Sequence, residues 1–421
     1  MNTLKYNQFQ EIYDLDSVYC LVDFLKNEIK TFNKSQNTPA YEYSPQYDAA
    51  SNHLDQILDK KKLSTLHITV ITDFSCNMRC CYCYEGILTP SSGKTDVSSI
   101  HNFIKTKLTE TGATGIAVSI LGGEPLLPHN IEYLDELIKQ IRDIDPFSTF
   151  TIITNGLNAG RYASCIKDWG IEYLQITLDG PEEIQNTRRS PLADVNGFKQ
   201  ITENISTLLQ LGVSLELRVN VDRNNVIALP ELAKFIIEQG WMNFCFSTYL
   251  YPVTKSGCSS YHVLDSEETI FKLVLDEFQN QSQEIKSVFT YDFHGVDYID
   301  SLLNGTRPSI RPYFCGVSDQ YVISNDGHIY TCWWGLDHDE FCLGNIYDTQ
   351  NNLNQDVRNT FLNRSITKIS RCKTCKYKYI CGGGCAYTEW YKHGSLDQGN
   401  CANFDVIFQL YLKYCKENGK L

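Results

Sequence analysis

From about residue 66 onward, short apolar segments alternate with amphipathic helical segments, and this alternation limits the fold more than any other feature. The apolar segments are rich in β-branched residues, as expected for parallel strands that are buried on both faces. They are LHITVITDF, GIAVSILGG, FTIITNG, YLQITLDG, SLELRVNVD and FCFSTYLY. About six strand–helix repeats predict a parallel α/β sheet that closes fully or partly into a barrel.

Residue types suited to chemistry follow four of these segments directly. They are the cysteine loop Cys76–Cys83, Gly122–Pro125, Thr154–Gly156 and Asp179–Gly180. In parallel α/β barrels the reactive groups lie on the loops at the carboxyl ends of the strands. We therefore expect these four segments to share one rim of the barrel and to form one active site.

Composition sets the broad class of protein. The chain has 421 residues, of which 17 are cysteine, and a formal net charge of −13, which disfavours a general nucleic-acid binder. No run of about 18 apolar residues predicts a membrane span, and MNTLKYNQFQEIYDLDS lacks the apolar core of a secretory signal. We expect a cytoplasmic protein without nucleic-acid or membrane partners, in which clustered cysteines are metal ligands or redox groups rather than disulfides.

The first cysteine cluster is the loop that holds Cys76, Cys80 and Cys83. Three thiolates at this spacing can hold three corners of a cubane iron–sulfur cluster and leave the fourth iron open. An open metal position is what a substrate-binding site requires. The alternative is a structural zinc loop that takes a fourth ligand from elsewhere.

With Tyr82 directly before Cys83, this loop resembles the signature of the radical S-adenosylmethionine (radical SAM) superfamily. The resemblance implies a partial (β/α)6 TIM-like barrel and a 4Fe–4S cluster whose open iron is chelated by S-adenosylmethionine (SAM). It also implies that cleavage of SAM yields a 5′-deoxyadenosyl radical, which abstracts a hydrogen atom from the substrate. The cluster supplies this chemistry, and the protein orients it.

The rim segments resemble motifs of the same superfamily. Gly122, Gly123, Glu124 and Pro125 match its GGEP motif, which holds the methionine ammonium. The resemblance extends cofactor binding to Thr154, Asn155, Thr177 and Asp179. Arg188 or Arg189 would suit the methionine carboxylate, since guanidinium favours bidentate contact. Arg218 and Asn220 are further candidates, and for these last four a surface or salt-bridged role stays open.

The C-terminal cysteines are the second cluster. Their spacing resembles the SPASM extension, which carries two auxiliary 4Fe–4S clusters, whereas a zinc ribbon would leave three of the seven unexplained. The family pattern assigns Cys315, Cys332 and Cys385 to the first auxiliary cluster, and Cys372, Cys375, Cys381 and Cys401 to the second. Cys342, or with less support Cys258, could complete the first set; otherwise that site stays open. Gly382–Gly384 would let the backbone wrap closely around a cluster.

We predict four segments along the chain. They are an N-terminal extension at 1–65, the radical SAM barrel at 66–255, a bridge at 256–310 and the SPASM domain at 311–421. Within the extension, Gln8–Asp23 predicts a hairpin and Ser51–Lys60 an amphipathic helix, with a loop-like stretch between them. The extension is either a peptide-recognition module that binds a leader by strand addition or a cap on the barrel.

The SPASM resemblance implies an enzyme that oxidises a ribosomally made precursor peptide, through a cross-link or another modification, with an external electron donor of the flavodoxin or ferredoxin type. The alternatives are a maturase of anaerobic sulfatases and, from another class, a non-catalytic electron-transfer protein, which would need no cofactor-binding rim. No catalytic base can be chosen from the sequence. Four candidates for this base lie near the barrel's end or the bridge, and each is more typical of a structural role: Tyr249, Tyr251, Asp292 and His294.

Overall fold

The computed structural model describes residues 9–34, 45–59, 64–85, 93–253, 265–315, 320–348 and 353–421. The chain divides into two compact units. We call Leu63–Tyr291 with Gly316–Asn359 the barrel unit, and Met1–Lys62, Asp292–Cys315 and Thr360–Leu421 the terminal unit. None of the helices in the described part of the chain is long and apolar enough to cross a bilayer.

The barrel unit is built on six parallel strands, and all six apolar segments are confirmed as strands. Their order in the sheet is β11-β10-β8-β7-β6-β4. The strands are β4 (Thr65–Ile71), β6 (Gly115–Leu121), β7 (Thr149–Thr154), β8 (Tyr173–Thr177), β10 (Leu215–Val221) and β11 (Phe246–Pro252). The predicted partial barrel of the radical SAM type is therefore confirmed.

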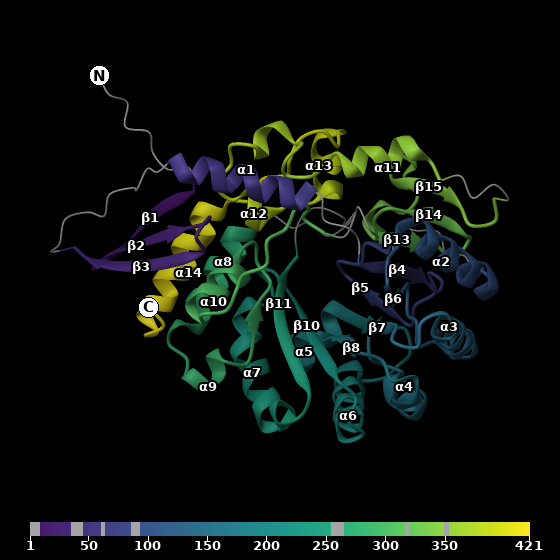
Figure 1. Ribbon diagram of the computed structural model, residues 1–421. Helices are drawn as coiled ribbons and strands as arrows, with labels where there is room; N and C mark the ends of the chain where they lie inside the picture. Colours follow the sequence, from purple (N-terminus) through teal and green to yellow (C-terminus); the bar gives the residue numbers. More distant parts are fainter. Residues whose placement is uncertain are drawn as a thin grey trace. The chain divides into compact units, whose positions relative to one another are not determined.

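Helices cover the outer face of these strands (Figure 1). They include α2 (Val97–Thr111), α3 (Ile131–Ile144), α4 (Ala163–Trp169), α6 (Gly197–Gln210), α7 (Leu229–Glu238) and α8 (Glu267–Gln279). Each of these helices can cover the sheet when one of its faces is apolar, and α3 is an example. Its buried residues recur every three or four positions and form one apolar face: Leu134, Leu137, Ile138 and Ile141. Helix α2 begins after Asp96, whose carboxylate accepts from the Ser99 amide at 3.0 Å.

The sheet extends beyond the barrel strands at both edges. One edge adds β12 (Thr290–Tyr291), and the other adds β13 (Gln320–Ile323), β14 (His328–Tyr330) and β15 (Cys342–Asn345). Strand β13 runs parallel to β4, whereas β14 and β15 follow as antiparallel strands. Cys332 and Cys342 therefore belong to the barrel unit.

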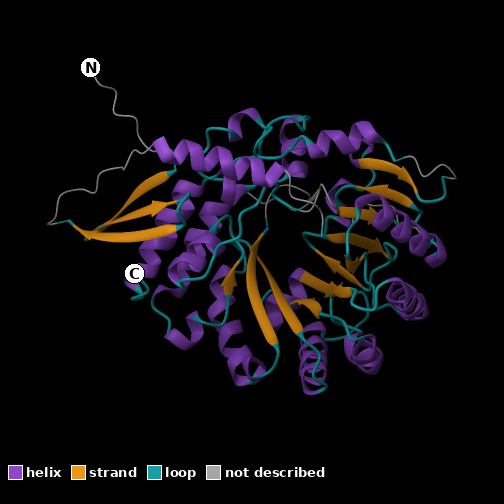
Figure 2. Ribbon diagram, in the orientation of Figure 1, coloured by secondary structure: helices purple, strands orange, loops and turns teal. Residues whose placement is uncertain are grey.

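The terminal unit holds a small antiparallel sheet of β1 (Gln10–Leu15), β2 (Val18–Asp23) and β3 (Glu28–Asn33). Figure 2 shows these three strands as one sheet. The predicted hairpin is present, but Gln8 and Lys60 lie outside the described residues. Strand β3 falls in the stretch that the sequence suggested was loop, because most of its side chains are exposed and it has no apolar run. The helix α1 (Pro45–Asp59) begins six residues before the predicted start at Ser51.

The other helices of the terminal unit come from late in the chain. They are α10 (Val296–Leu303), α12 (Lys378–Cys381), α13 (Ala386–His393) and α14 (Phe404–Glu417). Phe9, just before β1, packs in one buried cluster with Ile369, Cys372 and Tyr379. The Tyr379 hydroxyl lies 2.7 Å from the Ser51 hydroxyl on α1. The N-terminal elements and the cysteine-rich segment therefore share one core.

Candidate active site

The cysteine loop starts directly after β4 and is held by a two-stranded ribbon. Its strand β5 (Met78–Cys80) pairs antiparallel with β9 (Arg189–Pro191), which follows the helix α5 (Glu182–Arg188). In this register Cys80 lies opposite Arg189. The pairing places a guanidinium beside the thiols of the loop.

The thiols of this loop affect one another electrostatically. Burial raises the pKa of Cys76 to about 11, and the neighbouring charges of Glu124 and Cys80 raise it further. Burial also raises the pKa of Cys80 to about 11; the charge of Arg189 lowers it, and Cys83 adds a smaller raising effect. The Cys76 sulfur accepts from the Met78 amide at 3.4 Å and from the Asn155 side chain at 3.8 Å. Such donors favour a thiolate at Cys76.

The glycine pair after β6 fixes the start of the cysteine loop. The amides of Gly123 and Glu124 donate to the carbonyls of Asp73 and Ser75, each at 2.8 Å. A Cβ at Gly122 would lie 2.5 Å from the Asp73 carbonyl oxygen, and one at Gly123 would lie 2.2 Å from that of Ser75. Gly122 also has a φ of 142°, which only glycine adopts at low cost. No side chain fits at either position.

Glu124 joins two of the predicted motifs and is fully buried. Its carboxylate accepts from the Thr154 hydroxyl at 2.5 Å, the Asn155 amide at 2.7 Å and the Leu126 amide at 2.9 Å. Burial raises the pKa of Glu124, while these three bonds lower it. Pro125 lies buried in the turn that follows. Glu124 therefore holds the loop after β7 against the loop after β6.

Removing the Glu124 carboxylate should weaken cofactor binding. Glu124→Ala leaves three buried donors without their acceptor, at a cost of about 1–3 kcal/mol for each unsatisfied group. These unsatisfied donors should lower the melting temperature. The variant also lacks the charge-assisted hydrogen bond to the methionine ammonium that the GGEP resemblance implies, worth about 1.5–3 kcal/mol, so we expect the affinity for SAM to fall by about 10–150-fold. Anaerobic calorimetric titration with SAM measures the change. Glu132→Ala, at an exposed position on α3, is the matched control. An unchanged affinity for SAM in Glu124→Ala would show that the Gly122–Pro125 segment is only a turn and does not bind the cofactor.

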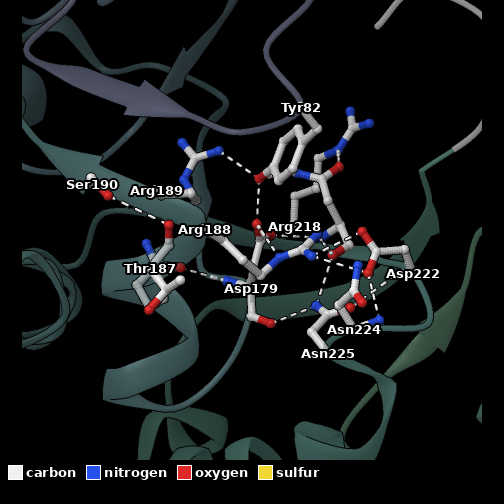
Figure 3. A network of polar contacts seen from close by, with 12 residues as sticks. Tyr82, Asp179, Thr187, Arg188, Arg189, Ser190, Arg218, Asp222, Asn224 and Asn225 are labelled. Carbon is white, nitrogen blue, oxygen red and sulfur yellow. Dashed lines mark hydrogen bonds and ion pairs between the residues drawn. The ribbon is translucent and has the colours of Figure 1, made fainter. Parts of the chain in front are cut away.

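A second polar network surrounds Tyr82 (Figure 3). The Tyr82 hydroxyl donates to Asp179 and accepts from Arg189 at 2.8 Å and from the Asn220 side chain at 3.1 Å. Asp179 is fully buried, and its second oxygen accepts from the Asn220 amide at 2.9 Å. The ends of β8 and β10 and the cysteine loop therefore meet in one network.

The two neighbouring arginines differ in what they bind. Arg188 pairs with Asp222 at 2.8 Å and with Asp179 at 3.5 Å, so its charge is neutralised inside the protein. Arg189 is 8% exposed, and its guanidinium donates to the neutral Tyr82 hydroxyl. Among the described residues the Nε atoms of both arginines lack a hydrogen-bond partner, but that of Arg188 lies 3.5 Å from Asp179. Arg189 is therefore the guanidinium of this pair that is better placed to bind an anionic ligand.

Arg218 and Thr177 lie opposite each other on the adjoining strands β10 and β8. The Arg218 Nε donates to Asn220 at 2.9 Å, and its guanidinium lies 3.9 Å from the centre of the Tyr251 ring. Tyr251 and Tyr249 both lie on β11 in the barrel unit. Asp292 and His294 belong to the terminal unit.

The sequence pointed to Asn220 but missed its neighbours beyond β10. The Asn225 side chain donates to the Asp179 carbonyl at 2.7 Å, and Asp222 neutralises Arg188. Both residues follow the end of a parallel strand, as Asp179 does. Polar residues directly after such a strand are the signal that could have found them.

The four cysteines predicted to hold the second auxiliary cluster all belong to the terminal unit. Burial raises the pKa of Cys381 to about 12, and the charges of Cys372, Cys375 and Cys401 raise it further. Burial likewise raises the pKa of Cys372, and the charges of Cys375 and Cys401 raise it further. Gly384, with a φ of 75°, has no room for a side chain, since a Cβ would lie 1.9 Å from the Asn400 carbonyl oxygen. The glycine run thus permits the close approach that brings Cys401 to the other three.

The remaining cysteines of the pattern lie in both units. Cys315 and Cys385 are in the terminal unit, where both lie near the guanidinium of Arg364, and burial lowers the pKa of that group. Cys342 is on β15 of the barrel unit, and Cys258 lies outside the described residues. Across the described ranges, no three His, Cys, Asp or Glu side chains are grouped so as to hold a single metal ion.

Comparison with known proteins agrees with this geometry. The family model described as "Radical SAM superfamily" matches residues 70–236, which include the cysteine loop, all the rim segments and strand β10. Residues 70–236 therefore form a radical SAM domain. Its cofactors accordingly are SAM and a 4Fe–4S cluster.

Relatives of this radical SAM enzyme extend the likeness over most of the chain. The cysteine-type anaerobic sulfatase-maturating enzyme of Clostridium novyi (strain NT) is 26% identical over 357 residues, which are 80% of this chain and 92% of that protein. The solved structure of anSMEcpe with bound AdoMet and a peptide has a TM-score of 0.63 at 20% identity and covers 84% of this chain and 96% of that one. Streptococcus suis SuiB bound to the precursor peptide SuiA has a TM-score of 0.57 at 14% identity, covering 94% and 98%. These two structures share the fold.

Proposed function

We propose that this radical SAM enzyme is a SPASM-type maturase that oxidises a ribosomally made precursor peptide whose leader binds the N-terminal sheet. The observation that carries the proposal is the three-stranded antiparallel sheet with β3 at its edge. Strand addition to a sheet edge is a common way of binding an extended peptide. Two similar proteins support the substrate class, since anSMEcpe and SuiB were each solved with a bound peptide.

In this proposal the barrel unit provides the reactive site. Cys76, Cys80 and Cys83 would hold the 4Fe–4S cluster, because they share one loop at the carboxyl end of β4, in which Cys80 lies opposite Arg189. Bound SAM and cluster supply the radical that takes a hydrogen atom from a side chain or α carbon of the peptide. Arg189 would bind the methionine carboxylate through its remaining donor. Glu124 and Asn155 would fix the loops around the cofactor.

The C-terminal cysteines would hold two auxiliary 4Fe–4S clusters. We propose Cys372, Cys375, Cys381 and Cys401 as ligands of one cluster: all four belong to the terminal unit, and Gly399, two residues before Cys401, lies so close to Cys372 that a Cβ there would be 3.2 Å from its sulfur. We propose Cys315, Cys332 and Cys385 as ligands of the other, with Cys342 as the fourth. A flavodoxin or ferredoxin would supply electrons.

The edge of β3 has a defined set of outward-facing groups. The Lys34 amide donates to the Ser17 carbonyl at 3.5 Å, and β2 and β3 pair in register from this point. Because antiparallel pairs alternate between hydrogen-bonded and non-hydrogen-bonded, the amides of Ile29, Thr31 and Asn33 face away from β2. A leader added at this edge would bond to these amides.

Proline at Thr31 should block this edge while leaving the sheet in place. Thr31 is exposed, and proline is tolerated on an edge strand where its missing amide faced outward. Thr31→Pro removes one donor and prevents the leader from pairing beside it, a loss of about one or two hydrogen bonds. At roughly 0.5–1.5 kcal/mol each, the Kd of the precursor peptide should rise by about 3–150-fold.

The matched control is Thr31→Val, which keeps the amide and should bind the peptide as the wild type does. Peptide binding is measured by fluorescence anisotropy of a labelled leader, and turnover by mass spectrometry. Uncoupled cleavage of SAM should be equal in all three proteins, since it needs the barrel unit alone. Equal leader affinity in Thr31→Pro and Thr31→Val would rule out strand addition at β3.

A sulfatase maturase is the second candidate, favoured by the 26% identity to the Clostridium novyi enzyme. Such an enzyme oxidises one Cys or Ser of a sulfatase and needs no leader. Mass spectrometry separates the two functions. A leader-dependent change in the precursor peptide supports the first function. A two-electron oxidation of one Cys or Ser in a sulfatase-derived peptide without a leader supports the second.

A further inference from the structure

Two aromatic rings of the barrel unit join the first cysteine loop to the segment after β14. Tyr84, directly after Cys83, packs on Trp334 with ring centroids 4.2 Å apart and an angle of 36° between the planes. These residues are 250 positions apart in the chain. Neither residue belongs to the motifs that the sequence analysis singled out.

Tyr84 directly follows Cys83 in the chain, and Trp334 lies two residues after Cys332. The Tyr84 hydroxyl donates to the Glu85 carboxylate at 3.2 Å, which fixes the orientation of the ring. The stack therefore joins the residue after a cysteine of the first loop to the turn that follows a cysteine proposed for an auxiliary cluster.

Trp334 is tied to Cys332 by the turn in which it lies. The short 3-10 helix η7 (Trp333–Gly335) follows Cys332, and the Gly335 amide donates to the Cys332 carbonyl at 3.1 Å. Gly335 packs against the fully buried Phe341 so closely that a Cβ would lie 2.2 Å from its ring. The turn cannot shift without disturbing this core. Cys332 and Trp334 therefore keep a fixed spacing within this turn.

We propose that Tyr84 and Trp334 are a positioning pair that fixes the separation of Cys83 and Cys332. This inference rests on the proposed function, in which Cys83 holds the SAM-binding cluster and Cys332 an auxiliary cluster. The pair acts through the spacing of two metal sites and does not itself react. A displacement of about 1 Å in an active site can lower a rate by about 100-fold, so a fixed stack at this point controls whether radical formation leads to product.

The experiment compares Trp334→Ala with Trp334→Phe, which keeps a ring for Tyr84 to pack on. Trp333→Ala, on the same turn, is the matched control for damage to the turn itself. Each protein is reconstituted anaerobically, and its iron content is measured. Electron paramagnetic resonance of the reduced protein then gives the microwave power that half-saturates the SAM-binding cluster. This readout depends on the distance to a second paramagnetic cluster and requires no turnover.

We expect Trp334→Ala to keep the iron content of the wild type but to lower the half-saturation power at least two-fold. The ratio of modified peptide to 5′-deoxyadenosine should fall by about 10–100-fold, while uncoupled SAM cleavage changes less than two-fold. Trp334→Phe and Trp333→Ala should match the wild type in both ratio and relaxation.

Unchanged relaxation and coupling in Trp334→Ala would overturn the inference, and so would a loss of iron, which would make the role purely structural. An equal effect of Trp333→Ala would overturn it as well. Failure of the proposed function looks different, because the wild type itself would then leave the precursor peptide unmodified. The relaxation measurement on iron-loaded protein would still decide whether the stack sets the spacing.

Discussion

Replacing Cys76, Cys80 and Cys83 together with alanine should abolish the formation of 5′-deoxyadenosine. These thiols are the proposed ligands of the cluster to which SAM binds, and no reductive cleavage occurs without that cluster. Ten motif cysteines in three four-iron sites correspond to about twelve irons and twelve sulfides per chain. The triple variant should therefore retain about eight of each, with both auxiliary clusters in place.

Cys81→Ala is the matched control, since Cys81 is an exposed neighbour in the same loop and lies outside the motif. It should keep about twelve irons and full cleavage. Iron and sulfide assays with anaerobic product analysis measure all three proteins. Continued SAM cleavage by the triple variant would show that the reactive cluster lies elsewhere. A wild type that saturates at about four irons per chain would contradict the assignment of two auxiliary clusters.

Deleting residues 1–59 should cost the enzyme its auxiliary iron as well as its leader binding. The deletion removes four almost fully buried side chains from the terminal unit: Phe9, Leu15, Val22 and Phe24. At about 1.5–3 kcal/mol each, their burial contributes roughly 6–12 kcal/mol, which is as large as the whole stability of a typical domain. We expect poor solubility and a fall from about twelve irons toward four. Cys76, Cys80 and Cys83 belong to the barrel unit, so slow uncoupled SAM cleavage should persist.

Thr31→Pro serves as the comparison, because it should impair leader binding without any loss of iron. Metal analysis of the soluble fraction and circular dichroism give the result of the deletion. A soluble truncated protein with about twelve irons would show that the N-terminal sheet is dispensable for the cysteine-rich segment. Such a protein, if it also modified the precursor fully, would remove the leader-binding role.

The barrel was predictable because its strands are buried on both faces and therefore have continuous apolar sequences. Strand β4 is an example, because its consecutive residues Thr69, Val70 and Ile71, which point to alternate faces, are at most 2% exposed. Strand β3 was not predictable in this way, because Glu28, Lys30 and Thr31 are exposed and only pairing with β2 makes them a strand. Its extended conformation comes from pairing with the neighbouring strand β2 and not from a local sequence pattern.

The members of the rim were predictable from their places after the strands, but their partners were not. The sequence suggested Arg188 or Arg189 for the same task, and only the ion pairs of Arg188 with Asp179 and Asp222 separate them. The role of Glu124 as the acceptor for Thr154 likewise depends on two loops meeting in space. Long-range pairs of this kind leave no local signal. The stack of Tyr84 on Trp334 belongs to the same class.

The shared core of Phe9, Ile369 and Cys372 has a consequence for synthesis of the protein. During translation the N-terminal segments of a protein emerge first and can begin to fold before the rest is made. Here the apolar face of β1 to β3 stays uncovered until residues beyond 360 have left the ribosome. Contacts between segments so distant in the chain also form slowly. Iron delivered before that time would meet a set of cysteines that is not yet assembled, so loading of the second auxiliary site should follow release of the finished chain.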